Sequence, residues 1–123
     1  MAVKNFEDLN SWKKARELTK AIYQVTNQGQ FLRDWALREQ MRRAAISIQS
    51  NISEGFERGS KKEYMLFLNI AKASSGELRS QLYTSLDLGY INEETFKALR
   101  DKADHISRML FNHIAYLKGM KKE

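Results

Sequence analysis

The sequence predicts an all-α protein that folds as an antiparallel, up-down-up-down four-helix bundle. Proline is absent, whereas average usage would supply about six, and this absence favours long, uninterrupted helices because proline breaks helix interiors. No segment alternates apolar and polar residues with the period of a β-strand. Five of the six glycines stand where a helical pattern ends, a position that glycine favours: Gly29, Gly55, Gly59, Gly89 and Gly119.

The helical patterns are long and the links between them are short, which favours antiparallel neighbours in one domain of 123 residues. The first helix is expected to be capped by Asn5 and the fourth by Asn92. Ser60 and Glu63 match a capping box at the start of the third helix. A basic tail follows at 119–123. The four predicted helices cover residues 6–26, 34–56, 61–88 and 93–118.

Composition limits the class of protein. The 21 Lys and Arg exceed the 15 Asp and Glu, which gives a net charge of +6. This excess favours an anionic partner such as nucleic acid, although an ordinary solubility charge explains the same value. Cysteine is absent, which excludes disulfides and thiolate chemistry. No apolar run of about 18 residues could span a membrane, so we expect a cytoplasmic protein without a membrane partner.

The residue types that carry catalysis or bind metals are sparse. The two histidines, His105 and His113, are preceded three positions earlier by Lys102 and Leu110. The Glu-x-x-His pairs of dimetal bundles are therefore missing, and no phosphate-binding glycine loop is present. His113 is interpreted as a residue at the edge of the core with an ordinary hydrogen bond. The sequence predicts no enzyme, no cofactor and no metal site.

The second predicted helix separates into faces at about 100° per residue. Its apolar face is ordinary core: Leu37, Met41, Ala44, Ala45, Ile48, Ile52 and Phe56. A polar strip borders this core: Gln40, Arg43, Ser47, Asn51, Glu54 and Arg58. The opposite, outer side holds Arg38, Arg42, Gln49 and Ser53. Half-buried polar groups need partners, so we expect Gln40, Ser47, Asn51 and Glu54 to bond across to a neighbouring helix or subunit. A ligand groove is the alternative.

The third predicted helix carries a second apolar patch, opposite its core face, at Leu66, Ile70 and Ala73. A surface helix of a monomer needs only one apolar face. We therefore expect self-association, with scattered surface apolar residues as the alternative. Glu77 lies within this patch and is expected to meet Arg43 of another copy.

Cations gather around the second helix and the turn that follows it. The candidate nucleic-acid-binding residues are Arg42, Arg43, Arg58, Lys61 and Lys62. With the backbone amides that open the third helix, they could contact phosphates regardless of base sequence. A capped turn with solvated charges is the competing interpretation. Aromatic residues are not interleaved with these cations, so base stacking has little support.

The same region carries a family resemblance. Gln40-Met41-Arg42-Arg43-Ala44-Ala45-x-Ser47-Ile48 and Asn51-Ile52-Ser53-Glu54-Gly55-x-x-Arg58-x-Ser60-x-x-Glu63-Tyr64 resemble the signature of the 23S rRNA intervening-sequence proteins. The resemblance implies a small bacterial four-helix bundle that assembles as a ring-like homopentamer. It also implies kinship with the accessory protein of diversity-generating retroelements, which accompanies a reverse transcriptase and binds nucleic acid. It supplies no catalytic residues.

Charge, patterning and resemblance together predict a non-enzymatic, homo-oligomeric bundle that binds RNA or DNA through the phosphate backbone. The alternative is a protein-interaction scaffold or accessory subunit with a protein partner and no nucleic-acid affinity of its own.

Overall fold

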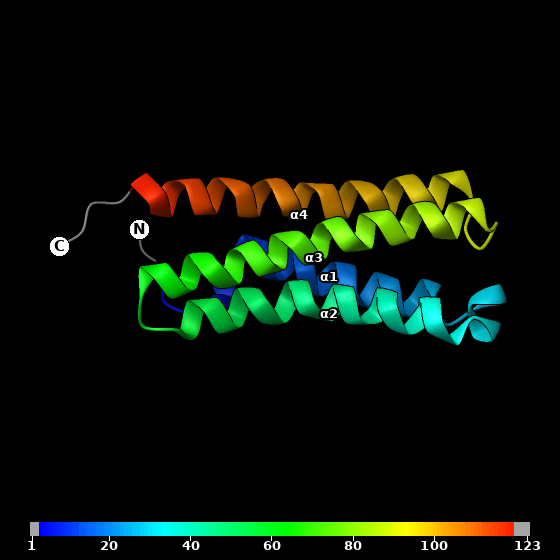
Figure 1. Ribbon diagram of the computed structural model, residues 1–123, viewed down its shortest axis with the longest axis horizontal. Coiled ribbons are helices and arrows are strands. Elements are labelled where there is room, and N and C mark those ends of the chain that lie inside the picture. The colour runs from blue at the N-terminus through cyan, green and yellow to red at the C-terminus, as the bar shows by residue number, and fades with distance from the viewer. Residues whose placement is uncertain (1–2, 120–123) are drawn as a thin grey trace.

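The protein folds as four antiparallel helices, which confirms the predicted fold class (Figure 1). A computed structural model describes residues 3–119, and this part of the chain contains no strand. Consecutive helices pack side by side and α1 closes the bundle against α4, while in the described bundle no Cα atoms of diagonal helices lie within 8 Å of each other. The elements are η1 (Phe6–Asp8), α1 (Asn10–Val25), η2 (Gly29–Arg33), α2 (Trp35–Glu57), α3 (Lys61–Asp87) and α4 (Glu93–Gly119).

Local capping explains most helix ends. The Ser60 hydroxyl oxygen accepts the Glu63 N–H at 3.1 Å, and the Asn92 side chain accepts the Thr95 N–H at 2.8 Å, so both predicted caps are confirmed. The predicted start of the first helix is wrong. The chain makes a 3-10 turn at η1, and Leu9 is extended before α1 begins. The Asn5 side chain makes no capping hydrogen bond.

The glycines divide into two physical roles. Gly29 and Gly89 have φ angles of 60° and 76°, the left-handed conformation expected where a helix ends. Gly55 does not end a helix, contrary to the prediction, because it is buried inside α2. A Cβ atom added there would lie 2.7 Å from the Cβ of Phe67 and 3.2 Å from the Tyr64 ring. Gly55 therefore allows α2 and α3 to approach each other closely beside their turn.

The predicted apolar faces form one continuous core along the bundle axis. On α2 the core face is buried as expected, with Leu37 and Phe56 only partly covered. Seven apolar residues at helical spacing form the buried inner face of α4: Phe96, Leu99, Ala103, Ile106, Leu110, Ile114 and Leu117. None of the helices in the described part is both long enough and apolar enough to cross a membrane. The basic tail lies outside the described residues, apart from Gly119 at the end of α4.

Candidate nucleic-acid interface

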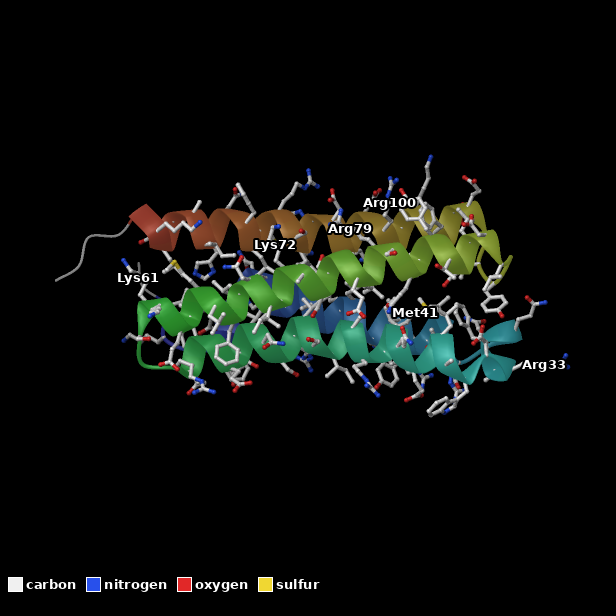
Figure 2. All side chains as sticks on the ribbon, in the orientation of Figure 1. Arg33, Met41, Lys61, Lys72, Arg79 and Arg100 are labelled. Carbon is white, nitrogen blue, oxygen red and sulfur yellow. The ribbon has the colours of Figure 1, made fainter. Side chains whose placement is uncertain are left out.

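The five predicted binding residues do not form one cluster. Arg43 precedes Glu57, the last residue of α2, by 14 positions, which corresponds to about 21 Å along the helix axis, and Arg58 follows Glu57. Lys61 and Lys62 open α3 at the turn, where Lys61 is half-buried and Lys62 is exposed. Figure 2 shows Lys61 at the turn end of the bundle and Arg33, shortly before α2 begins, at the opposite end. The turn and the rest of α2 are therefore separate candidate surfaces.

At the turn, the positive charge of Arg58 is compensated within the chain. Its guanidinium lies 2.9 Å from the Glu54 carboxylate and 3.5 Å from the Glu63 carboxylate. Its Cζ also lies 4.9 Å from the centre of the Phe67 ring. The prediction that Glu54 bonds across to a neighbouring helix or subunit is wrong, because its carboxylate pairs with Arg58, four positions later and directly after the end of α2. This group of side chains joins α2 to α3, and because its two carboxylates outnumber its one cation it offers no excess positive charge to an anion.

The middle of the polar strip joins α2 to α3, as the structural interpretation predicts. The Ser47 and Ser74 hydroxyls share a hydrogen bond of 2.8 Å. Asn51 donates within α2 to the Ser47 carbonyl and hydroxyl oxygens, at 2.8 and 3.0 Å, so its bonds do not cross to another helix. Gln40 and Arg43 are exposed, and neither forms a hydrogen bond or ion pair within the described chain. The strip is therefore half-buried only in its middle.

Arg42 lies against α1 rather than on the outer side of the bundle, so that expectation is wrong. Its guanidinium donates to the Thr26 hydroxyl at 2.9 Å and to the Tyr23 carbonyl at 3.4 Å. Its Cζ also lies 4.4 Å from the centre of the Tyr23 ring. Both acceptors are neutral, and no carboxylate of the described chain pairs with Arg42. The charge of this half-buried arginine therefore remains uncompensated.

The outward face of α1 carries cations that the sequence reasoning missed. Lys13, Arg16 and Lys20 are exposed and follow the helical spacing of one face. With Lys14 they give α1 four positive charges against the single carboxylate of Glu17, which is +3 of the chain's net +6. Their i, i+3, i+7 spacing in the sequence indicates that the three cations share one face of the helix. Half of the net charge thus lies on one helix.

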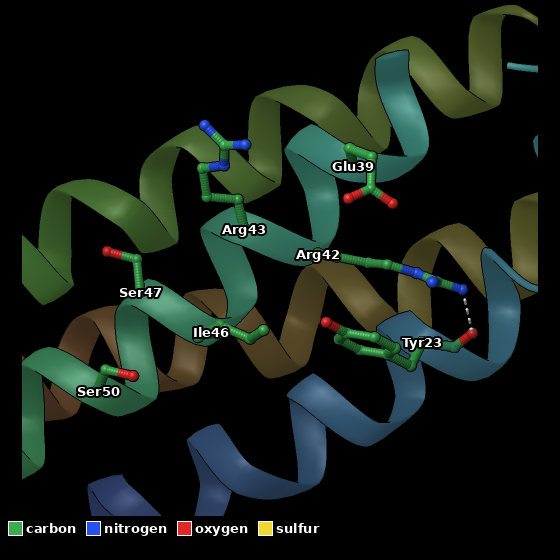
Figure 3. A pocket seen from close by; sticks show the side chains of 7 residues that line it. All are labelled: Tyr23, Glu39, Arg42, Arg43, Ile46, Ser47 and Ser50. Atoms are coloured by element: carbon green, nitrogen blue, oxygen red, sulfur yellow. Dashed lines mark hydrogen bonds between the residues drawn. The ribbon is translucent and has the colours of Figure 1, made fainter. Parts of the chain in front are cut away.

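Three shallow hollows connect these cations across α1 and α2. A hollow of about 400 Å³ is lined by Lys13, Arg16, Glu17 and Lys20. A second, of about 490 Å³, is lined by Lys20, Tyr23, Gln24, Asn27 and Arg42. A third, of about 340 Å³, is lined by Tyr23, Glu39, Arg42, Arg43, Ile46, Ser47 and Ser50 (Figure 3). Because neighbouring hollows share lining residues, we treat them as one surface, the cationic groove.

Five cations line the cationic groove: Lys13, Arg16, Lys20, Arg42 and Arg43. None of them pairs with a carboxylate in the described chain. The two carboxylates of the groove are each shared with a cation outside it: Glu17 lies 3.9 Å from Lys14, and Glu39 lies 3.9 Å from Arg38. The groove therefore keeps a net positive field over two neighbouring helices.

The remaining titratable groups contribute packing. His113 contacts the edge of the Tyr64 ring, with ring centres 5.0 Å apart, and contrary to the prediction it forms no hydrogen bond with any residue of the described range 3–119. Burial lowers the pKa of His113 and raises the pKa of Tyr64 to about 12. Among the described residues, no three His, Asp or Glu side chains are grouped in a way that could hold a metal ion.

Comparison with known proteins places this fold in a family. The model of the 23S rRNA-intervening sequence proteins matches residues 7–112. The chain belongs to the 23S rRNA-intervening sequence protein family. A crystal structure of a protein of unknown function from the S23 ribosomal protein family of Bacteroides thetaiotaomicron shares the fold, with a TM-score of 0.78 and 23% identity over 85% of this chain and 97% of that one. No curated protein matches.

Several of the residues that carry the resemblance to the 23S rRNA-intervening sequence proteins lie at the turn, where their roles are structural. Glu54, Arg58 and Glu63 form the ion pairs, Ser60 caps α3, and Gly55 admits Phe67. In this member of the family, the later part of the signature builds the connection between α2 and α3. Arg42 and Arg43, which stand near the start of the signature, line the groove.

Proposed function

We propose that this protein is a non-enzymatic, homo-oligomeric bundle that binds RNA or DNA through the phosphate backbone, with the cationic groove as the contact surface. One observation carries the proposal. Five cations from two helices share a continuous open surface, and none of them is neutralised by a carboxylate of the described chain. Such a surface attracts a polyanion regardless of its sequence.

The chemistry of the groove is that of binding rather than catalysis. Its charged groups are lysines, arginines and two carboxylates that already pair with cations. A catalytic site needs a nucleophile or a general base held within reach of the substrate and oriented by a further group. The proposal therefore assigns no reaction to the protein.

Self-association is part of the proposal and is supported by the outward surface of α2 and α3. Leu66 and Ile70 are 56% and 40% exposed, and Ala73 is also exposed beside them. Glu77 and Arg43 are exposed without a partner in the described chain, as a contact between copies requires. The family resemblance makes a pentamer the expected assembly. Several grooves on one assembly would strengthen weak individual contacts through multivalency.

Arg43 stands at the boundary between the cationic groove and this α2–α3 surface. If it pairs with Glu77 of another copy, each groove keeps four cations. A cytoplasmic location, which is expected from composition, and kinship with the accessory protein of diversity-generating retroelements, which the resemblance implies, remain expectations.

Salt dependence tests the phosphate contacts directly. We would titrate the purified protein into fluorescein-labelled nucleic acid at several NaCl concentrations and follow the anisotropy. For duplex DNA, log K falls with log[salt] with a slope of about −0.9 per phosphate neutralised. Each groove should therefore contribute about −4.5 with all five cations, or about −3.6 when Arg43 pairs with Glu77 of another copy. Absence of binding at low salt, or binding indifferent to salt, contradicts the proposal. A folded oligomer that captures a protein partner but no nucleic acid supports the scaffold alternative.

A further inference from the structure

We propose that the cationic groove takes nucleic acid as a single strand, with unpaired bases stacking on Tyr23 and Trp35. This inference rests on the proposed function and specifies which class of nucleic acid the groove binds. In the sequence, no aromatic residue is interleaved with the cations near the turn. In the folded chain, the packing of α1 on α2 places an aromatic ring directly against one of the groove cations.

Tyr23 forms the centre of the groove. Its side chain extends from α1 beside Arg42 of α2 (Figure 3), and the Arg42 guanidinium lies 4.4 Å from the ring centre. Tyr23 lines both the second and the third hollow and is 37% exposed. An arginine stacked on an aromatic ring is a common platform for a nucleobase, since both planes attract its π-face.

Trp35 lies on the same face of α2 as Arg42, two turns earlier, which is about 10.5 Å along the helix axis. Its side chain is 67% exposed, and it makes no ring contact in the described chain. The other tryptophan, Trp12, is half-buried with its ring 5.1 Å from that of Phe6. Packing therefore explains Trp12 and leaves Trp35 as a large, rigid, exposed apolar surface on the face of α2 that also carries Arg42.

The position of these rings distinguishes single strands from duplexes. In a duplex, the faces of the bases are stacked on one another and only phosphates and base edges reach a shallow surface. The groove cations could contact such a duplex, but Tyr23 and Trp35 would remain in solvent. A single strand offers its phosphates to Lys13, Arg16 and Lys20 and its free base faces to the two rings, so it gains contacts that the duplex cannot make.

The test compares a labelled 20-nucleotide DNA strand, an RNA strand of the same sequence and the corresponding blunt DNA duplex, by fluorescence anisotropy at one low salt concentration. We expect the wild-type protein to bind both strands more tightly than the duplex. The Trp35→Leu variant should lose about 5-fold to 100-fold in affinity for the single strands, the effect of one stacked base. Its duplex affinity should stay within about 2-fold. Tyr23→Leu is the second variant, and light scattering and circular dichroism check assembly and fold for both.

Intrinsic fluorescence gives an independent readout. The Trp12→Phe variant keeps Trp35 as its one indole, and its emission should be quenched by the single strand and unchanged by the duplex. Equal or tighter duplex binding, or unaltered single-strand binding by both leucine variants, overturns the inference while leaving phosphate binding intact. A Trp35→Leu protein with altered assembly mass and unaltered strand preference also overturns it, because Trp35 would then lie between copies. If no nucleic acid binds at low salt, the proposed function fails as well.

Discussion

Two arginines, Arg42 within α2 and Arg58 directly after its last residue, show how differently the same side chain can be used. Arg58, at the turn, has a side chain that is 44% exposed, yet the carboxylates of Glu54 and Glu63 compensate its charge. Arg42, in the cationic groove, is half-buried, yet its acceptors are a hydroxyl and a carbonyl and its charge is uncompensated. The identity of the acceptor, more than exposure, decides whether a cation remains available to a polyanion.

The largest expected effect concerns the close packing at the turn. Gly55→Ala should destabilise the protein by about 1–3 kcal/mol, the usual cost of overpacking a core. The added methyl carbon would lie 2.7 Å from the Phe67 Cβ, an atom fixed close to its own backbone. Urea unfolding followed by circular dichroism measures the change.

Gly76→Ala is the matched control, since it places the same methyl group inside α3. The nearest neighbour there is the end of the flexible Arg79 side chain at 3.7 Å. This variant should gain about 0.5–1 kcal/mol from improved helix propensity. If both alanine variants have the same stability, the turn is not the closely packed region described above.

The next effect separates the two arginines themselves. Arg42→Met should lower the free energy of unfolding by about 1–2 kcal/mol, because it removes charge-assisted hydrogen bonds to α1. It should also weaken nucleic-acid binding. Arg58→Met removes two partly exposed ion pairs, which are worth about 1 kcal/mol or less, and should change binding by less than about 2-fold. Urea unfolding and anisotropy on the same preparations measure both quantities. A larger loss of nucleic-acid binding in Arg58→Met than in Arg42→Met would contradict the contrast drawn between the two arginines.

The smallest effect concerns His113, which packs against Tyr64 near the turn. Burial lowers its pKa from the ordinary value of 6.5, so the unfolded chain binds this proton more readily than the folded one. The stability that the neutral ring contributes is present above pH 6.5 and is lost as pH falls through the lowered folded pKa. Urea unfolding between pH 7.5 and 5 should show a smaller decline for His113→Gln than for the wild type. If the free energy of unfolding declines equally in the variant and the wild type, His113 does not contribute to the pH dependence of stability.

The sequence predicted the fold because helical periodicity and helix caps are local signals. The inner faces of α2 and α4, and the caps at Ser60 and Asn92, follow from spacing alone. The prediction that Asn5 caps the first helix was wrong because the choice between a 3-10 turn and a helix at Phe6–Asp8 depends on packing against later helices. Gly55 resembles a helix end in sequence, and only the approach of Phe67 shows its role.

The candidate site was less predictable because it is assembled from two helices. A helical wheel of α2 does not show on which side α1 packs, so Arg42 was expected on the outer face. It also cannot show that Glu63 of α3 reaches Arg58. The cations of α1 were visible as Lys13, Arg16 and Lys20, but their connection to Arg42 through Tyr23 requires the folded chain.

One pair of variants tests the central claim that the groove, rather than the turn, binds nucleic acid. The groove variant carries Lys13→Gln, Arg16→Gln and Lys20→Gln, and the turn variant carries Arg58→Gln, Lys61→Gln and Lys62→Gln, so each loses three positive charges. Their salt slopes would be measured by anisotropy on one labelled DNA. We predict that the groove variant loses about 2–3 units of slope, at 0.7–0.9 per lost phosphate contact, and that the turn variant keeps the wild-type slope. An unchanged slope in the groove variant, with the loss in the turn variant, would contradict the account.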